Sequence, residues 1–414
     1  MNTGLIKQPP WFMLLGPGLL IAATGVGAGD LATASFSGSH LGLAVLWAVV
    51  VGGILKYVLT EGLARWQLAT GISFLEGLAQ QSGLIFGWLF LPYLFLWSFF
   101  VGAALMSASG ATLHALFPFF ESASDGKIFF GVISSLCGLV LVLLGGFKLF
   151  EKMMSLCIGL MFVTVLVTAG MLWPGWQAVV TGLLIPSIPD AQGMGVTWTL
   201  ALIGGVGGTL TILCYGYWIR EKGRDSTDDI KFCRIDLALG YAMTIVFGLA
   251  MVIIGSQVEI DGKGAGLLVN LSNKLAEALG PVGYWLFLIG AFGAVFSSLL
   301  GVWQAVPYLF ADVWRLTFSK QEPSKTIDTS SLPYRGYLIA LSLIPMLGLL
   351  MSFKEAQKLY ALVGAAFMPI LALALLWMNR PKYLGRYANS GLVTVLLLCT
   401  LGFFGFMAWK KWFV

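Results

Sequence analysis

The sequence predicts an all-α integral membrane protein of eleven transmembrane helices, built as two five-helix repeats of opposite topology plus one C-terminal helix. Its 414 residues are 58% hydrophobic and only 10% charged, whereas soluble domains carry about 25% charged residues. In addition, glycine-rich stretches interrupt the first and the sixth apolar runs. Interrupted helices at matching positions in two halves are typical of secondary transporters with inverted repeats, whose substrate site lies near the bilayer midplane.

The apolar runs are bounded by charged residues or by glycine and proline, and each is long enough to cross a membrane. The eleven predicted spans lie near residues 12–38, 43–66, 84–113, 128–147, 153–173, 198–218, 236–256, 282–308, 336–352, 356–378 and 391–409. Spans one to five would form the first repeat (residues 1–174), and spans six to ten the second, inverted repeat (198–378). Residues 391–414 would be the appended helix.

The distribution of basic residues predicts the orientation. If the amino terminus is cytoplasmic, sixteen Lys and Arg residues fall in inner loops, seven fall outside and Lys56 lies within a span, which accounts for all 24. The positive-inside rule favours this arrangement. We therefore expect a multi-pass protein of the cell (inner) membrane with an external carboxyl terminus. The dispersed basic residues give no sign of nucleic-acid binding.

Several function classes have no support in the sequence. The five cysteines show no Cys-x-x-Cys spacing, and the two histidines have no partner at metal-ligand spacing. No Walker loop, catalytic carboxylate pair or nucleophile elbow occurs. We expect neither an enzyme nor a cofactor. The expected partners are the lipid bilayer and a transported substrate, and we expect a monomer.

The first interruption reads GVGAGD at residues 25–30. Glycine costs roughly 1 kcal/mol per residue in a helix interior, so three glycines in five positions predict a break. At membrane depth a break survives only where it lines protein or a water-filled cavity. Asp30 ends this stretch and could bind the substrate or a coupling ion. Alternatively, it could cap the half-helix at residues 31–39.

The second glycine-rich stretch reads GGVGG at residues 204–208 and is followed by two hydroxyl side chains, Thr209 and Thr211. These could coordinate a hard cation or hydrogen-bond an organic solute. Alternatively, they could cap the following half-helix or bond back to it.

Further polar residues could serve as accessory or coupling groups. Lys56 is either a functional internal cation or a side chain that snorkels to an interface, and Glu61 and Arg65 could form a surface pair. Serines and a glutamine in span eight could form an ion site with the first interruption, although such residues more often join helices by hydrogen bonds. The accessory candidates are Thr24, Gly25, Lys56, Ser297, Ser298 and Gln304.

The segment GPGLLIAATGVGAGDLAT at residues 16–33 resembles the first helix of the Nramp divalent-metal transporters, whose motif reads G-P-G followed by D-P-G-N and A-T. The likeness continues in the right order over most of the chain, at residues 63–71, 146–151, around Pro186, 234–236 and 297–298. This resemblance implies the LeuT-type fold of the amino acid, polyamine and organocation superfamily. It also implies transport of a divalent metal. A proton or sodium ion is the expected coupling ion.

This sequence departs from the family motifs at the metal ligands. The D-P-G-N motif falls on residues 27–30, so Gly27 replaces the metal-binding aspartate and Asp30 stands at the asparagine position. The M-P-H motif of the sixth helix falls on residues 208–210, so Gly208 replaces the methionine. The acidic residues of the family's third helix have no counterpart in residues 84–118.

Three functions stay open on these grounds. A divalent metal would be bound by oxygen ligands, which favour manganese or magnesium over iron. The alternative is a small organic solute such as an amino acid, with its amine on Asp30 and its carboxylate on N–H groups at half-helix ends. A transport-dead receptor is the third. The candidate substrate residues are Gly27, Asp30, Gly205, Gly208, Thr209 and Thr211.

The predicted orientation can be tested with a tag placed after Val414. An impermeant reagent added to intact cells or spheroplasts should label this tag, because the carboxyl terminus is expected outside. Labelling that appears only after the membrane is broken would contradict the eleven-span topology.

Overall fold

The computed structural model describes residues 16–257, 267–318 and 327–413, and the regular structure in these ranges is helical throughout. The elements discussed below are α1 (Pro17–Gly25), η2 (Val26–Thr33), α2 (Ala34–Leu41), η3 (Gly42–Val45), α3 (Leu46–Thr70), α4 (Phe74–Ser82), α5 (Leu84–Leu116), α6 (Ala123–Met171), α7 (Trp176–Leu184), α8 (Gly195–Gly205), η4 (Leu210–Cys214), α9 (Tyr215–Glu221), α10 (Ile230–Ser256), α11 (Leu267–Phe318), α12 (Leu332–Leu343), η6 (Ile344–Leu350), α13 (Phe353–Met378), α14 (Pro381–Leu384), η7 (Gly385–Tyr387) and α15 (Gly391–Phe413).

Nine helices within the described ranges are long and apolar enough to cross a membrane. One of them, Asp30–Thr70, joins the end of the first predicted span to the second, and a shorter apolar helix, Gly391–Met407, covers most of the eleventh. Residues 12–15 of the first span lie outside the described residues, as do residues 258–266 between the seventh and eighth predicted spans. The membrane-protein class agrees with the sequence prediction, while the count of eleven stays a prediction.

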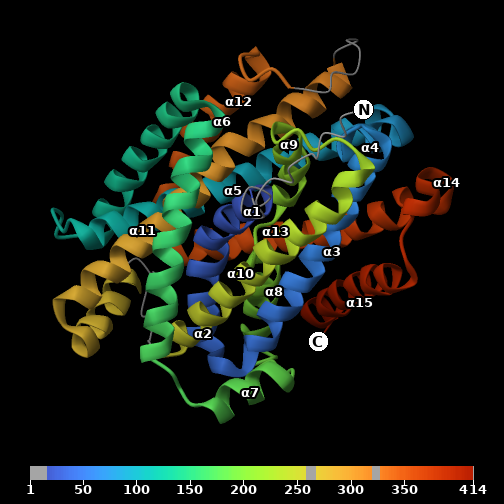
Figure 1. Ribbon diagram of the computed structural model, residues 1–414. Helices are drawn as coiled ribbons and strands as arrows, with labels where there is room; N and C mark the ends of the chain where they lie inside the picture. Colours follow the sequence, from blue (N-terminus) through green and yellow to red (C-terminus); the bar gives the residue numbers. More distant parts are fainter. Residues whose placement is uncertain (1–15, 258–266, 319–326, 414) are drawn as a thin grey trace, which may run out of the picture.

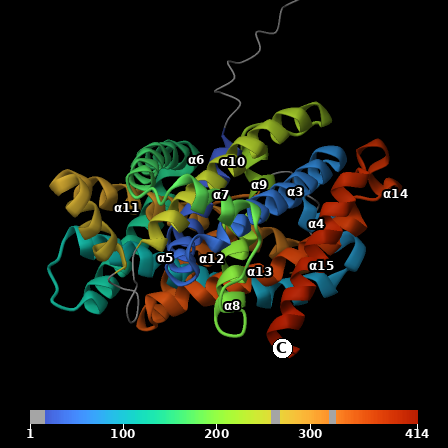
Figure 2. The ribbon, with the colours of Figure 1, turned by 90° about the horizontal axis from the view of Figure 1, so that it is seen from below.

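The helices form a bundle whose middle contains α1, α8 and α10 (Figure 1). Helices α1 and α2 pack on α10, and α8 packs on α13. In both views α15 lies at one edge of the bundle, while α6 and α11 lie on the opposite side (Figure 2). The two glycine-rich stretches therefore belong to the most enclosed helices.

The two predicted interruptions have different structures. After α1, the chain continues as the π-helical segment η2, so the glycines at residues 25–30 widen the helix and do not produce the non-helical break that was expected. Wide turns of this kind are frequent at functional sites. By contrast, α8 ends at Gly205, and Gly207 and Gly208 adopt left-handed φ angles of 70° and 80° before η4 begins. We call residues 206–209 the second interruption.

Close helix contacts in the middle of the bundle depend on glycine. A Cβ atom at Gly255 of α10 would lie 2.7 Å from the Cα atom of Ser35 in α2. At Gly402 of α15, an added Cβ would meet nothing within 4 Å. The same substitution should therefore act differently at the two positions.

Gly255→Ala should destabilise the protein by about 1–3 kcal/mol, the usual cost of overpacking a buried contact. Gly402→Ala should leave stability unchanged or raise it by up to about 1 kcal/mol, because alanine is the better helix former. Thermal unfolding of the purified variants in detergent would measure both effects. Equal melting temperatures for the two variants would contradict the packing of α2 against α10.

Candidate functional site

The two glycine-rich segments meet backbone to backbone. A Cβ atom at Gly25 would lie 2.6 Å from the carbonyl carbon of Gly207 and 2.7 Å from the amide nitrogen of Gly208. No larger residue fits at Gly25 without separating the segments. The candidate site is therefore the junction between the end of α1, η2 and the second interruption.

Lys56 of α3 reaches this junction and is fully buried. Its three hydrogen bonds all go to backbone carbonyl oxygens around the second interruption, namely those of Gly204 at 2.7 Å, Val206 and Gly208. The ammonium therefore does not snorkel to an interface in this structure. Of the two sequence interpretations, the internal cation agrees with the geometry.

Asp30 of η2 is also fully buried and faces the second interruption. Its Oδ2 atom accepts a hydrogen bond from the amide of Gly207 at 3.3 Å, while its Oδ1 atom has no hydrogen-bond partner. Asp30 thus holds the Gly207 amide of the second interruption, and no hydrogen bond to residues 31–39 supports the alternative in which it caps that half-helix. The charges of Asp30 and Lys56 attract each other, but none of the ion pairs found between described residues joins them.

The hydroxyl groups after the second interruption have separate environments. Thr209 is fully buried, and its Oγ1 accepts a hydrogen bond from the indole Nε1 of Trp97 in α5 at 2.6 Å. It makes no side-chain cap at the start of η4. The hydroxyl of Thr211 lies beside Gly208, where it would collide with a Cβ atom at that position. Trp97 belongs to no recognisable motif, so it could not be selected from the sequence.

Two serines of α11 satisfy the backbone near the start of η2. The Ser298 hydroxyl accepts from the amide of Gly27 at 2.7 Å and donates to the carbonyl of Ala23 at 2.9 Å. The hydroxyl of Ser297 donates to the carbonyl of Ala294 at 2.9 Å and lies 3.4 Å from that of Ala23. Both serines therefore join helices by hydrogen bonds at the expected place.

Three other candidate residues have local roles. The Thr24 hydroxyl bonds back to the carbonyl of Leu20 within α1, at 2.7 Å. The carbonyl of Gly205 accepts from the amide of Gly208 at 3.3 Å and so closes the turn after α8. Gln304 accepts from the indole of Trp218 at 2.9 Å and lines a separate cavity of about 190 Å³. Its hydrogen bonds do not reach the junction, so its assignment to an ion site with the first interruption finds no contact here.

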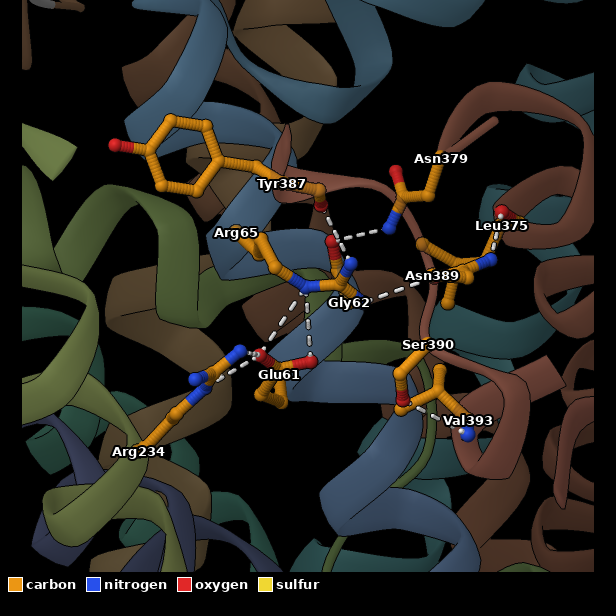
Figure 3. Close-up of polar contacts among 10 residues, drawn as sticks. All are labelled: Glu61, Gly62, Arg65, Arg234, Leu375, Asn379, Tyr387, Asn389, Ser390 and Val393. Carbon is orange, nitrogen blue, oxygen red and sulfur yellow. Dashed lines mark hydrogen bonds and ion pairs between the residues drawn. The ribbon is translucent and has the colours of Figure 1, made fainter. Parts of the chain in front are cut away.

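A second polar cluster holds α3 in place (Figure 3). Arg65 is paired with Glu61 at 3.1 Å, and both side chains are buried, so this pair is not the surface pair that the sequence suggested. Arg65 also donates to the carbonyl of Tyr387 at 2.7 Å, and Arg234 of α10 pairs with Glu61 at 2.8 Å. These contacts tie the helix that carries Lys56 to α10 and to the segment after α13.

Two aspartates that the sequence did not single out as site residues join helix ends to neighbouring helices. Asp236 of α10 accepts from the amides of Gly16 and Gly18 at 3.2 and 2.8 Å, and so caps the start of α1. Asp312 of α11 accepts from the hydroxyl of Tyr217 in α9 at 2.7 Å. The sequence feature that could have identified both residues is a carboxylate beside or within an apolar run.

Asp312 also accepts from the hydroxyl of Ser73, at the start of α4, at 2.9 Å. Burial raises the pKa of the neighbouring Glu76 carboxyl above its ordinary value, and the guanidinium of Arg315 partly offsets this rise. This polar group fastens α4, α9 and α11 to one another on the side of the bundle where α9 ends.

The junction offers a specific chemistry. The Oδ1 atom of Asp30 has no hydrogen-bond partner, while the carbonyls around the second interruption accept hydrogen bonds from the Lys56 ammonium. Within the described ranges, no group of three or more His, Cys, Asp or Glu residues could hold a metal ion. Asp30, Lys56 and Thr209 are fully buried, so the junction is closed to solvent in this structure. A positively charged group could be received by Asp30 once the helices open.

Residues 18–410 match the family described as "Natural resistance-associated macrophage protein-like". The relatives include a divalent metal cation transporter MntH of Chromohalobacter salexigens, 23% identical over 84% of this chain and 83% of the relative. An uncharacterized protein of Pasteurella multocida is 22% identical over 77% and 75% of the two chains.

Solved structures show the same fold. A crystal structure of a mutant Eremococcus coleocola manganese transporter aligns with a TM-score of 0.74 at 16% identity, over 98% of this chain and 87% of that one. The structure of MhsT in complex with L-phenylalanine aligns with a TM-score of 0.62 at 15% identity, over 94% and 96%. At these identities the structures support the LeuT-like fold and not a substrate.

The left-handed backbone explains why glycine stands at position 208. Gly208→Ala should cost about 1–2 kcal/mol of stability, because an L-residue in this conformation is strained, and Gly208→Met should cost at least as much. Gly336→Ala in α12, where an added Cβ meets nothing within 4 Å, is the control. Thermal unfolding would compare the three, and a stable Gly208→Ala protein would contradict the turn described here.

Proposed function

The chain belongs to the natural resistance-associated macrophage protein-like family, and from this we propose that it is a secondary active transporter that imports a divalent metal cation. The match over residues 18–410 and the LeuT-like fold support a transporter. The curated relatives named as divalent metal cation transporters support the substrate class.

The observation that carries the proposal is the free Oδ1 atom of Asp30. Burying a carboxylate oxygen without a hydrogen-bond donor costs free energy. A cation that enters the junction would supply the missing partner of Oδ1 without displacing an existing hydrogen bond. The amide of Gly207 holds the other oxygen and thereby fixes the direction of the carboxylate. Asp30 would be the charged ligand, with Thr209, Thr211 and the backbone oxygens of Gly27 and Gly205 as the uncharged candidates, whereas the Gly208 carbonyl stays with Lys56.

The ligand chemistry favours a hard ion. Gly208 stands where the family has methionine, so oxygen atoms replace the soft thioether of the family site. Oxygen ligands suit manganese or magnesium better than iron. A proton or sodium gradient would drive uptake, through two five-helix repeats of opposite topology in the cell membrane.

A small organic solute such as an amino acid is the second candidate. The observation that favours it is the ammonium of Lys56, which already places one positive charge at the carbonyls of the second interruption. One carboxylate beside a lysine cannot neutralise the two charges of a divalent ion, whereas it can neutralise the single positive charge on the amine of a solute.

Uptake into liposomes that contain the purified protein would distinguish the two candidates. The substrates to compare are manganese, magnesium and a panel of amino acids, each with and without a proton or a sodium gradient. We expect uptake of manganese and magnesium with little discrimination between them. Amino acid uptake without metal uptake would establish the second candidate, and no uptake of either would contradict both.

Asp30→Asn tests the role of the carboxylate. The amide oxygen can still accept from Gly207, but the charge is lost. A charge-assisted contact is worth about 1.5–3 kcal/mol, so uptake should fall about tenfold or more. Asp125→Asn, at an exposed position in the first turn of α6, is the matched control and should transport normally. Normal kinetics in a folded Asp30→Asn protein would remove Asp30 from the site.

A further inference from the structure

We propose that the Lys56 ammonium is a tethered cation that fills a binding position for a monovalent metal ion, and that removing Lys56 will open this position to sodium. The position is formed by three backbone carbonyls around the second interruption. The inference concerns cation binding at this turn, so it does not depend on which substrate the protein transports.

The number and direction of the contacts support this assignment. An ammonium has three N–H donors and no acceptor, and here each donor finds one carbonyl, of Gly204, Val206 or Gly208. These carbonyls belong to alternate residues of one turn and converge on one atom. The left-handed conformations of Gly207 and Gly208 are what give the turn this shape.

A convergent set of buried carbonyls is a cation site by its chemistry. Backbone carbonyl oxygens replace the hydration shell of potassium in channel filters, and unwound backbone carbonyls coordinate sodium in transporters with interrupted helices. Without a positive partner, these three acceptors would be left unsatisfied in a medium that offers no water. Lys56 supplies that partner from the protein itself.

The fold keeps the lysine in this position. The hydroxyl of Thr60, one turn beyond Lys56 in α3, is hydrogen-bonded to Tyr241 of α10 at 2.7 Å. Further along α3, Gln67 donates to the carbonyl of Gly216 in α9 at 2.6 Å. The side chain of Lys56 is itself fully buried. The charge of Asp30, which attracts that of Lys56, stabilises a cation at this place.

A tethered charge cannot be released into either aqueous compartment. A free sodium ion held at these carbonyls could be carried across the membrane with the substrate, whereas Lys56 stays with α3 throughout the cycle. The wild-type protein should therefore neither bind nor require sodium at this position. Of the two coupling ions considered under the proposed function, this reasoning disfavours sodium at the second interruption.

The test measures thermal stability of purified protein in detergent as sodium chloride replaces choline chloride. The wild-type melting temperature should not change. Lys56→Ala leaves the carbonyls and the vacated space, so its melting temperature should be lower in choline and should rise by several degrees, saturably, with sodium. Lys56→Met fills the same space without a charge and should show no such rise.

Lys127→Ala is the matched control. Lys127 also donates to two backbone carbonyls, of Leu349 and Met351, at 2.8 and 2.7 Å, but it lies outside the junction. This variant should lose stability without gaining a response to sodium, which separates a cation site from general salt stabilisation.

Three outcomes would overturn the proposal: a saturable sodium response in the wild-type protein, an equal response in Lys56→Ala and Lys127→Ala, or a Lys56→Ala protein that sodium fails to stabilise or to fold at any concentration. Because the readout contains no substrate, failure of metal uptake would leave this result unaffected, and failure here would leave metal uptake open.

Discussion

An interrupted helix at membrane depth leaves carbonyl oxygens that neither the helix nor lipid can satisfy, and in this protein the Lys56 ammonium satisfies them. Two other features of the structure make this contact possible. Glycine is needed at positions 207 and 208 to turn the carbonyls toward one atom. The cluster around Glu61 and Arg65 is needed to hold α3 where the lysine can reach.

Backbone groups of the second interruption therefore contact a positive and a negative side chain within one turn. Its carbonyls accept hydrogen bonds from Lys56, while its Gly207 amide donates one to Asp30 of η2. Because Asp30 belongs to the helix that α1 begins, movement of α1 would change the surroundings of the carboxylate and of the turn together. Asp236 and Asp312 tie the starts of α1 and α4 to α10 and α11.

The sequence was sufficient for the helical membrane class, for the two glycine-rich segments and for the choice of Asp30 as an intramembrane charge, while it left open whether Lys56 stays inside the bundle or snorkels to an interface. Composition and spacing record these features directly. The sequence could not reveal that η2 stays helical, because glycine propensity predicts a break and packing against α10 and α11 decides the outcome. It also could not pair Lys56 with carbonyls 148 to 152 residues away, or Trp97 with Thr209, since such contacts follow from the assembled fold.

Anomalous diffraction from crystals grown with manganese tests the central claim most directly, namely that Asp30 receives the transported cation while Lys56 keeps the carbonyls. The account predicts a manganese peak in direct contact with Asp30 Oδ1, with the Lys56 ammonium still on the carbonyls of Gly204, Val206 and Gly208. A peak that lies away from Asp30, or one on those carbonyls with Lys56 displaced, would contradict it.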